Sequence, residues 1–177
     1  MTRPSKNMRR ALLLFLALLQ LPLIAKAQTS EVFRDHELQF SFRHPSNWKS
    51  VNAQRPSRVL LYAQDGSEAT ANVSVVTSDR HLVSEFNRAY FQATLSKVYK
   101  HVSVKDVKYI HVLGKEMAIV ESTFMVAMPS ETFKARSLAM ATIQNGQRYM
   151  LIVNGLPEKF TSPTKAFDLM VGTFMFF

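Results

Sequence analysis

The chain contains no cysteine in its 177 residues. This absence excludes disulfide bonds, cysteine-ligated zinc, a thiol nucleophile and a lipid anchor on a cysteine. Glycine is also scarce, with five residues, and none belongs to a glycine-rich run that could cradle a phosphate. The fold must therefore rest on packing alone, and a domain of about 150 residues buries enough surface for that.

Histidines are few, and their spacing is unlike that of metal ligands. They lie at His36, His44, His81, His101 and His111, so no pair fits H-x-H, H-x-x-x-H or H-E-x-x-H. The G-x-S-x-G motif of serine hydrolases is absent as well. The sequence therefore predicts a protein that is not an enzyme, with no catalytic residue, metal ligand or cofactor.

Only one long apolar run occurs, and it lies at the start of the chain. Residues 1–10 carry four cations and no acid, residues 11–25 are almost entirely apolar, and the small-residue sequence A-K-A follows at 25–27. This order is typical of a secretory signal peptide, and the run is short for a bilayer-spanning helix. We expect residues 1–27 to be a cleavable signal peptide, with an uncleaved anchor as the alternative. Residues 28–177 would then be a single domain, periplasmic or secreted.

The positive charge of the chain is concentrated in this first segment. The whole chain has 22 Lys and Arg against 13 Asp and Glu, a net charge of +9. Five of these cations lie in the first 27 residues, so cleavage would leave a net charge of +4. Nucleic-acid binding needs a concentrated basic face, and this remainder does not favour it.

Period-two alternation of apolar and polar residues predicts a mainly antiparallel sheet. Residues 38–43 alternate in this way and are followed closely by Pro45, which should end the strand. Asn145-Gly146 is a dipeptide typical of tight hairpins. Strands are expected at 38–43, 58–63, 71–77, 105–112, 115–128, 133–144 and 147–154.

The segment 115–128 is apolar on both of its faces, with Met117 on one and Val120 on the other. A strand buried on both sides needs cover on both sides. Apolar residues at helical spacing predict one helix over about 82–100 and a second from Ser162 to the end of the chain. We therefore expect an α+β fold, an α/β/α sandwich whose antiparallel sheet of about six to seven strands is covered by two main helices.

Two short motifs carry a resemblance to a known family. The first expected strand is followed by H-P-S-N-W at 44–48, and the chain closes with T-F-M-F at 173–176. Together with the order of elements over 36–177, these motifs resemble the PsbP/Mog superfamily, and in particular its exported bacterial PsbP-like and DcrB-like members. The resemblance implies the same sandwich fold and a non-enzymatic role in binding or assembly.

The only tryptophan, Trp48, stands in the first of these motifs. We expect it to pack over the end of the sheet, because tryptophan brings a large apolar area together with one N–H group that needs a partner. The alternative is a ligand site near the strand end, formed by His44 and Trp48.

The densest positive charge in the expected domain lies between residues 97 and 108, where only Asp106 opposes it. The patch consists of Lys97, Lys100, His101, Lys105 and Lys108. Cations at the end of a helix complement its dipole and keep a surface soluble. The functional interpretation is a patch that docks an acidic partner protein or an anionic lipid surface.

Methionine is frequent, with nine residues. Methionine fills irregular gaps in a core, and it also lines adaptable apolar pockets. The sequence therefore predicts a non-enzymatic accessory or assembly protein of the cell envelope that acts through contacts with an envelope protein. The alternative is a periplasmic carrier of a small apolar ligand, held between sheet and helix in a pocket lined by methionine and aromatic side chains.

Overall fold

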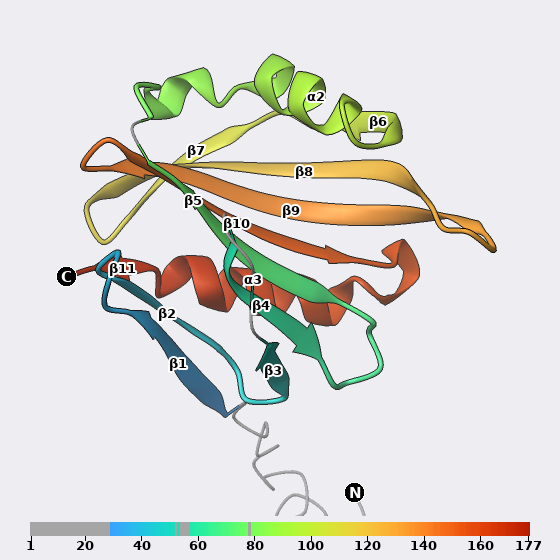
Figure 1. The fold of residues 1–177 in the computed structure, drawn as a ribbon, viewed down its shortest axis with the longest axis horizontal. Coiled ribbons are helices and arrows are strands. Elements are labelled where there is room, and N and C mark those ends of the chain that lie inside the picture. Colours follow the sequence, from blue (N-terminus) through green and yellow to red (C-terminus); the bar gives the residue numbers. More distant parts are fainter. Residues whose placement is uncertain (1–28, 52, 54–56, 78) are drawn as a thin grey trace, which may run out of the picture.

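A long antiparallel sheet forms the centre of the fold (Figure 1). The structure is a computed structural model that describes residues 29–51, 53, 57–77 and 79–177. The expected signal peptide, residues 1–27, lies outside the described residues. In spatial order the strands are β3 (Trp48–Val51), β4 (Ser57–Ala63), β5 (Thr70–Val76), β10 (Gln147–Gly155), β9 (Thr132–Gln144), β8 (Lys115–Ala127) and β6 (Lys100–Val104), and β7 (Lys108–Val112) also pairs with β8.

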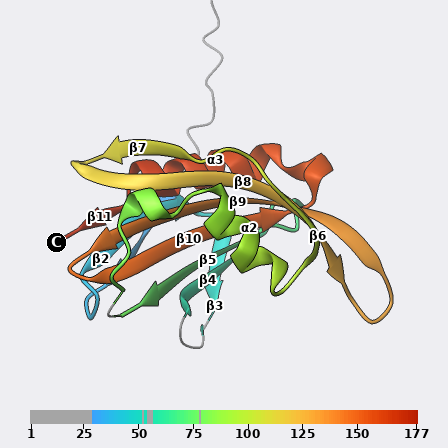
Figure 2. The same cartoon turned by 90° about the horizontal axis from the view of Figure 1, so that it is seen from above.

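Helices cover the two faces of this main sheet, one helical layer above and one below in Figure 1, and Figure 2 shows the green helical layer lying over the strands. On one face lie the 3-10 helix η1 (Val83–Glu85) and α2 (Arg88–Ser96). On the other face lies α3 (Thr161–Gly172), which follows the 3-10 helix η2 (Pro157–Lys159). A second, small sheet packs against α3 and consists of β1 (Ser30–Asp35), β2 (Phe40–Pro45) and β11 (Met175–Phe176). None of the described helices is both long enough and apolar enough to cross a membrane.

The hairpin β8–β9 is buried on both of its faces, as its sequence predicts. Met117 and Met140 point into the core between the main sheet, α3 and the small sheet, and both are fully buried. Ala118 and Val120 point to the opposite side, into a smaller core beneath η1 and α2. Successive side chains of a strand alternate between its faces, so this hairpin requires both covering layers.

The α+β class, the antiparallel pairing and the two covering helices match the expectation from the sequence, but the expected strand number is wrong. The main sheet has eight described strands rather than about six to seven. The expected strand 105–112 corresponds to β7 and begins only at Lys108, and β6 is a separate strand before it that was not expected. Strand β3 has four residues, too few to show alternation, and the first expected strand corresponds to β2 and belongs to the small sheet.

The helix expected over 82–100 is also wrong in length, because α2 covers only nine residues. It begins later than expected since the side chain of Asn87 accepts a hydrogen bond from the backbone N–H of Tyr90 and caps the helix. The chain does not end in a helix either, because Met175 and Phe176 form β11 after α3. The hairpin turn at Asn145-Gly146 and the end of β2 at Pro45 are confirmed.

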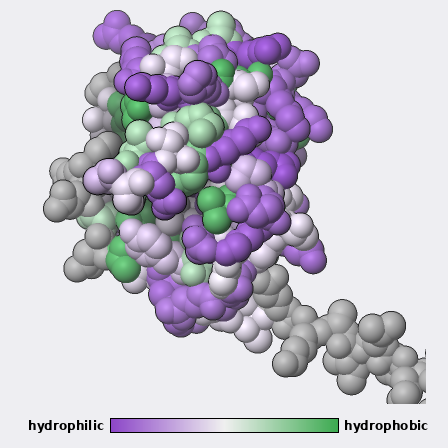
Figure 3. All heavy atoms as spheres, turned by 90° about the vertical axis from the view of Figure 1, so that its right-hand side faces the viewer, coloured by the Kyte–Doolittle hydropathy of each residue, from purple (hydrophilic) through white to green (hydrophobic). Residues whose placement is uncertain are grey.

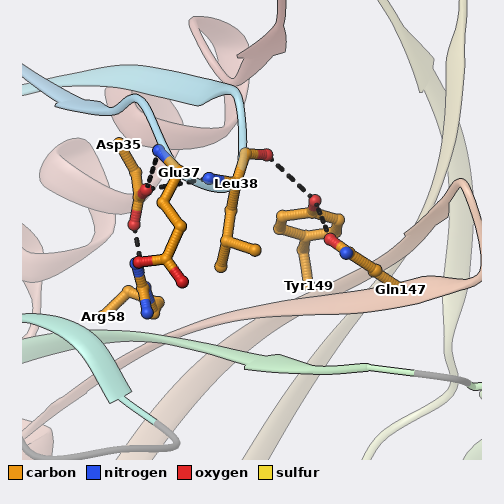
Figure 4. Close-up of polar contacts among 6 residues, drawn as sticks. All are labelled: Asp35, Glu37, Leu38, Arg58, Gln147 and Tyr149. Carbon is orange, nitrogen blue, oxygen red and sulfur yellow. Dashed lines mark hydrogen bonds and ion pairs between the residues drawn. The ribbon is translucent and has the colours of Figure 1, made fainter.

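An ion pair ties the small sheet to the main sheet (Figure 4). A register shift in β4 between Ser57 and Val59 leaves Arg58 as an extra residue. The Nε atom of Arg58 lies 2.8 Å from Oδ2 of Asp35, at the end of β1, and the side chains of Arg58 and Asp35 are 16% and 8% exposed. Arg58 Nη2 also lies 2.6 Å from a carboxylate oxygen of Glu37.

Hydrogen bonds keep Asp35 ionised in this buried place. Burial alone would raise the pKa of Asp35, but hydrogen bonds from Arg58 and from the backbone N–H groups of Leu38 and Glu37 outweigh it and lower that pKa. A second contact lies nearby, since the hydroxyl oxygen of Tyr149 in β10 is 3.1 Å from the carbonyl oxygen of Leu38 and 2.6 Å from Oε1 of Gln147 (Figure 4). Both contacts fix the turn between β1 and β2 over the main sheet.

We predict that Arg58→Met lowers the free energy of unfolding by about 3 kcal/mol, because it leaves the Asp35 carboxylate buried without its cation. Urea denaturation should measure this in a double-mutant cycle with Asp35→Asn. In the Asp35→Asn background the cost of Arg58→Met should be much smaller. An equal cost in both backgrounds would show that the ion pair does not hold the two sheets together.

Candidate binding groove

The structure places the five cations predicted as a patch along one edge of the main sheet. We call Lys97, Lys100, His101, Lys105 and Lys108 the cationic edge; all five are exposed. Lys97 caps the end of α2, and both β6 and β7 pair with β8. Lys100 lies opposite Met125 and Lys108 opposite Ile119, so the cations extend over about 20 Å of the edge.

One member of the cationic edge is held by an acid. The Nζ atom of Lys105 lies 2.9 Å from a carboxylate oxygen of Glu121, which Arg136 approaches to 3.0 Å. Burial would raise the pKa of Glu121, but the hydrogen bonds from Lys105 and Arg136 outweigh it and lower that pKa. Lys97, Lys100 and Lys108 form no ion pair with another described residue.

His44 and Trp48, the other predicted pair, are both buried. The Nδ1 atom of His44 lies 3.0 Å from the carbonyl oxygen of Pro45, and 5% of the residue is exposed. Trp48 begins β3 and is fully buried in the core cluster that also contains Phe42. Its indole ring therefore faces core side chains rather than an opening. Its Nε1 atom has no hydrogen-bond partner among the described residues.

Two neighbouring cavities that the sequence did not locate lie on the α2 side of the main sheet. The inner part, between α2 and the sheet, has a volume of about 190 Å³, and its lining includes Phe91, Leu95, Val120, Ser137, Ala139 and Ile152. The outer part is a separate cavity of about 530 Å³ that opens at the end of the sheet, and its lining includes Glu68, Val126, Glu131, Phe133, Leu156 and Glu158. Tyr99, Phe124 and Asn154 line both parts. We call the two parts together the α2 groove.

Small side chains on one face of the sheet create this space. Ser137 and Ala139 in β9 and Ser122 in β8 point toward α2 and line the inner part. The only buried residue of α2 is Phe91. Side chains this short do not fill the gap between a helix and a sheet, so atoms are missing where a close-packed core would have them.

The inner part of the groove is mainly apolar, with a few polar atoms. Tyr99 and Phe124 stack at its boundary, with ring centroids 4.0 Å apart and ring planes 15° apart. Asn72 donates from Nδ2 to the hydroxyl of Ser57, while its buried Oδ1 has no hydrogen-bond partner among the described residues. This composition, apolar walls with a few placed polar groups, is typical of small-molecule sites.

The outer part is acidic at its rim. Among the described residues, the charged ones that line it are all glutamates: Glu68, Glu131 and Glu158. Glu68 is paired with Lys159, whose Nζ atom lies 2.5 Å from it. Figure 3 shows this end of the molecule, where apolar atoms gather across the middle and polar atoms surround them. The outer part can therefore accept a group that is cationic, apolar or both.

The sequence did not identify the residues that line the groove, because the methionines expected to line it lie elsewhere. Two serines were the signal that could have located it. The alternative expectation was a pocket lined by methionine and aromatic side chains. The buried methionines Met117, Met140 and Met170 fill the core instead. Only Met150 lines the groove. The usable signal was Ser122 and Ser137, polar residues on otherwise apolar strand faces.

A second polar cluster lies beyond the other end of α2, beside an open cavity of about 420 Å³. Oδ1 of Asp79 lies 2.5 Å from Nδ1 of His81, and Oδ2 lies 3.2 Å from Nη1 of Arg148. Arg148 also donates to the hydroxyl of Tyr90. Burial would raise the pKa of Asp79, but hydrogen bonds from His81 and the charge of Arg148 outweigh it and lower that pKa. The cluster ties the loop before η1 to β10.

The described residues contain no group of three or more His, Asp or Glu side chains arranged to hold a metal ion. The α2 groove combines apolar walls with a few polar groups, and it is the candidate site that we consider below.

Comparisons with known proteins agree with this fold. The family model described as PsbP matches residues 28–176. The cyanobacterial PsbP (CyanoP) from Synechocystis has a similar structure, with a TM-score of 0.65 and 11% identity over 87% of this chain and 96% of that one. The Ran-binding protein Mog1p from Saccharomyces cerevisiae gives a TM-score of 0.63 at 6% identity, over 85% of this chain and 96% of its own.

A third similar structure is LpqN of Mycobacterium tuberculosis, which is involved in cell envelope biogenesis. Its TM-score is 0.52 at 10% identity, over 83% of this chain and 90% of that one. No curated protein matches the sequence. At these identities the structures show a shared fold.

We predict that Asp79→Asn lowers the free energy of unfolding by about 2 kcal/mol at pH 7, because Arg148 loses its buried partner. The folded pKa of Asp79 lies below its unfolded value, so the ionised carboxylate contributes fully above about pH 5 and loses its contribution as the pH falls through the folded pKa. Urea denaturation at several pH values should show the gap between wild type and variant closing toward acid pH. A gap that stays constant with pH would contradict this account, and Asp168→Asn, at an exposed site on α3, is the control.

Proposed function

This chain belongs to the PsbP family, and we propose that it is a non-enzymatic accessory protein of the cell envelope that binds an acidic partner protein through the cationic edge. Two relatives support a binding role in general terms. Mog1p is a Ran-binding protein, and LpqN is involved in cell envelope biogenesis. The partner of this chain would be an envelope protein or, as a second kind of acidic surface, anionic lipid.

The observation that carries the proposal is the mixture of cations and apolar side chains from the end of α2 to the turn after β7. Val98, Tyr109 and Leu113 stand among or beside the lysines, and they are 73%, 43% and 66% exposed. Lysines alone on an edge strand are explained by protection against sheet-to-sheet association. Exposed apolar residues next to the cations are not explained in that way, and they are typical of an interaction surface.

Export supports the envelope location. Residues 1–27 have the order of charge, apolar run and small-residue site that the export machinery recognises. The family match begins at residue 28, immediately after the proposed cleavage site. The exported chain would thus begin with the family domain.

The α2 groove favours a second candidate function, a carrier of a small apolar ligand. The outer part alone has about 530 Å³, within the range of about 300–1,000 Å³ of small-molecule sites. The two functions use different surfaces, the sheet edge in one and the space beneath α2 in the other.

We predict that the protein recovered from the periplasm or medium of its host begins at Gln28. Intact-mass measurement should show the loss of residues 1–27. A mass that retains the apolar run, in a protein that fractionates with membranes, would contradict cleavage and would support an uncleaved anchor.

We predict that changing Lys97, Lys100 and Lys108 to Glu weakens partner binding about tenfold or more, because repulsion replaces attraction over the whole edge. Partners would be captured by in-cell crosslinking in the native host, identified, purified and measured by calorimetry at low and high salt. The wild-type affinity should fall as salt rises, since exposed charges are screened.

The matched control changes Arg34, Arg43 and Lys165, three exposed cations elsewhere, to Glu. This variant has the same net charge but keeps the cationic edge. Equal loss of binding in both triple variants would reflect net charge alone and would overturn the edge as the docking surface.

A further inference from the structure

The two parts of the α2 groove differ in chemistry. The inner part lies beneath α2 and is lined mainly by apolar side chains, such as Phe91, Leu95 and Ile152. The outer part is open to solvent and carries glutamates. A ligand that fills both parts must therefore have an apolar end that can be desolvated and an end that remains near water.

The charge at the mouth is not balanced within the described residues. Glu68 pairs with Lys159, but Glu131 and Glu158 form no ion pair with another described residue. The lining contributes no cation. Lys159, which is paired with Glu68, also acts electrostatically on Glu158. The three glutamates still leave a net negative charge at the opening, and this charge attracts a positive group there.

Aromatic rings lie where the two parts meet. Tyr99 and Phe124 line both parts and stack on each other, and Phe133 lines the outer part next to Glu131. The faces and edges of such rings suit alkyl chains, and an aromatic face also attracts a cation, an ammonium group above all. The boundary therefore favours a chain that ends in a cationic group over one that ends in an acid.

We propose that the α2 groove binds a single-chain amphiphile with a cationic head group, its apolar chain lying beneath α2 and its head lying between Glu131 and Glu158. This proposal rests on the carrier function given above, and it names the chemistry of the ligand. The unpaired Oδ1 of Asn72 offers a hydrogen-bond acceptor within the inner part.

Three probes with the same chain test the head-group preference: decyltrimethylammonium, decanol and decanoate, each below its micelle concentration. Calorimetry on the purified protein should show that decyltrimethylammonium binds about fivefold more tightly than decanol, and decanoate more weakly than both. Amide NMR shifts should change at Tyr99 and Phe124.

Variants locate the site and the charge. Glu131→Gln with Glu158→Gln should remove the difference among the three probes, while Glu116→Gln, at an exposed site at the other end of β8, should keep it. Ala139→Leu, which fills the inner part, should weaken all three about tenfold. Thr94→Phe does the same from an exposed position on α2, so a fold defect at Ala139 does not obscure the result.

Each pattern of results has one meaning. Equal binding of the three probes, lost in Thr94→Phe, would keep the carrier function and overturn the cationic preference, as would tighter binding of decanoate. Binding that survives both blocking variants would overturn the groove as the site. No binding of any probe would overturn the carrier function together with the ligand class.

Discussion

Burial of the β8–β9 hairpin on both faces is the constraint on which the rest of this structure depends. A strand that is apolar on both sides cannot lie at the surface of a sheet, so each face must find a covering layer. The two faces of the hairpin are covered to different extents. One face receives α3 and the small sheet, joined to the main sheet by Arg58 and Asp35. The other face receives only η1 and the nine residues of α2.

This inequality follows from the side chains of the hairpin itself. Met117 and Met140 fill the space toward α3, whereas Ser122, Ser137 and Ala139 face α2 and leave space beneath it. The side of the sheet toward α3 is a close-packed core, and the side toward α2 contains the α2 groove. The weaker cover is thus the reason that a groove remains beneath α2.

The cationic edge and the α2 groove meet at one short segment. After α2 ends, Lys97 and Lys100 belong to the edge while Tyr99 turns inward and stacks on Phe124. A partner docked on the edge would therefore contact the segment that forms one wall of the groove. The two surfaces have opposite charges, with lysines on the edge and glutamates at the mouth, so each would favour a partner of a different charge.

The sequence by itself determined those features that depend on residues close together in the chain. Alternation and helical spacing predicted the hairpin at Asn145-Gly146, the second helix and the need for cover on both faces, and two short motifs indicated the family. Tertiary structure decided the rest. Strands β1, β3 and β11 are short or weakly patterned, and they form because partners distant in the chain lie beside them. Arg58 meets Asp35, and Tyr99 meets Phe124, only after the strands have paired. A site assembled from several strands depends on their register, and one sequence does not specify that register locally.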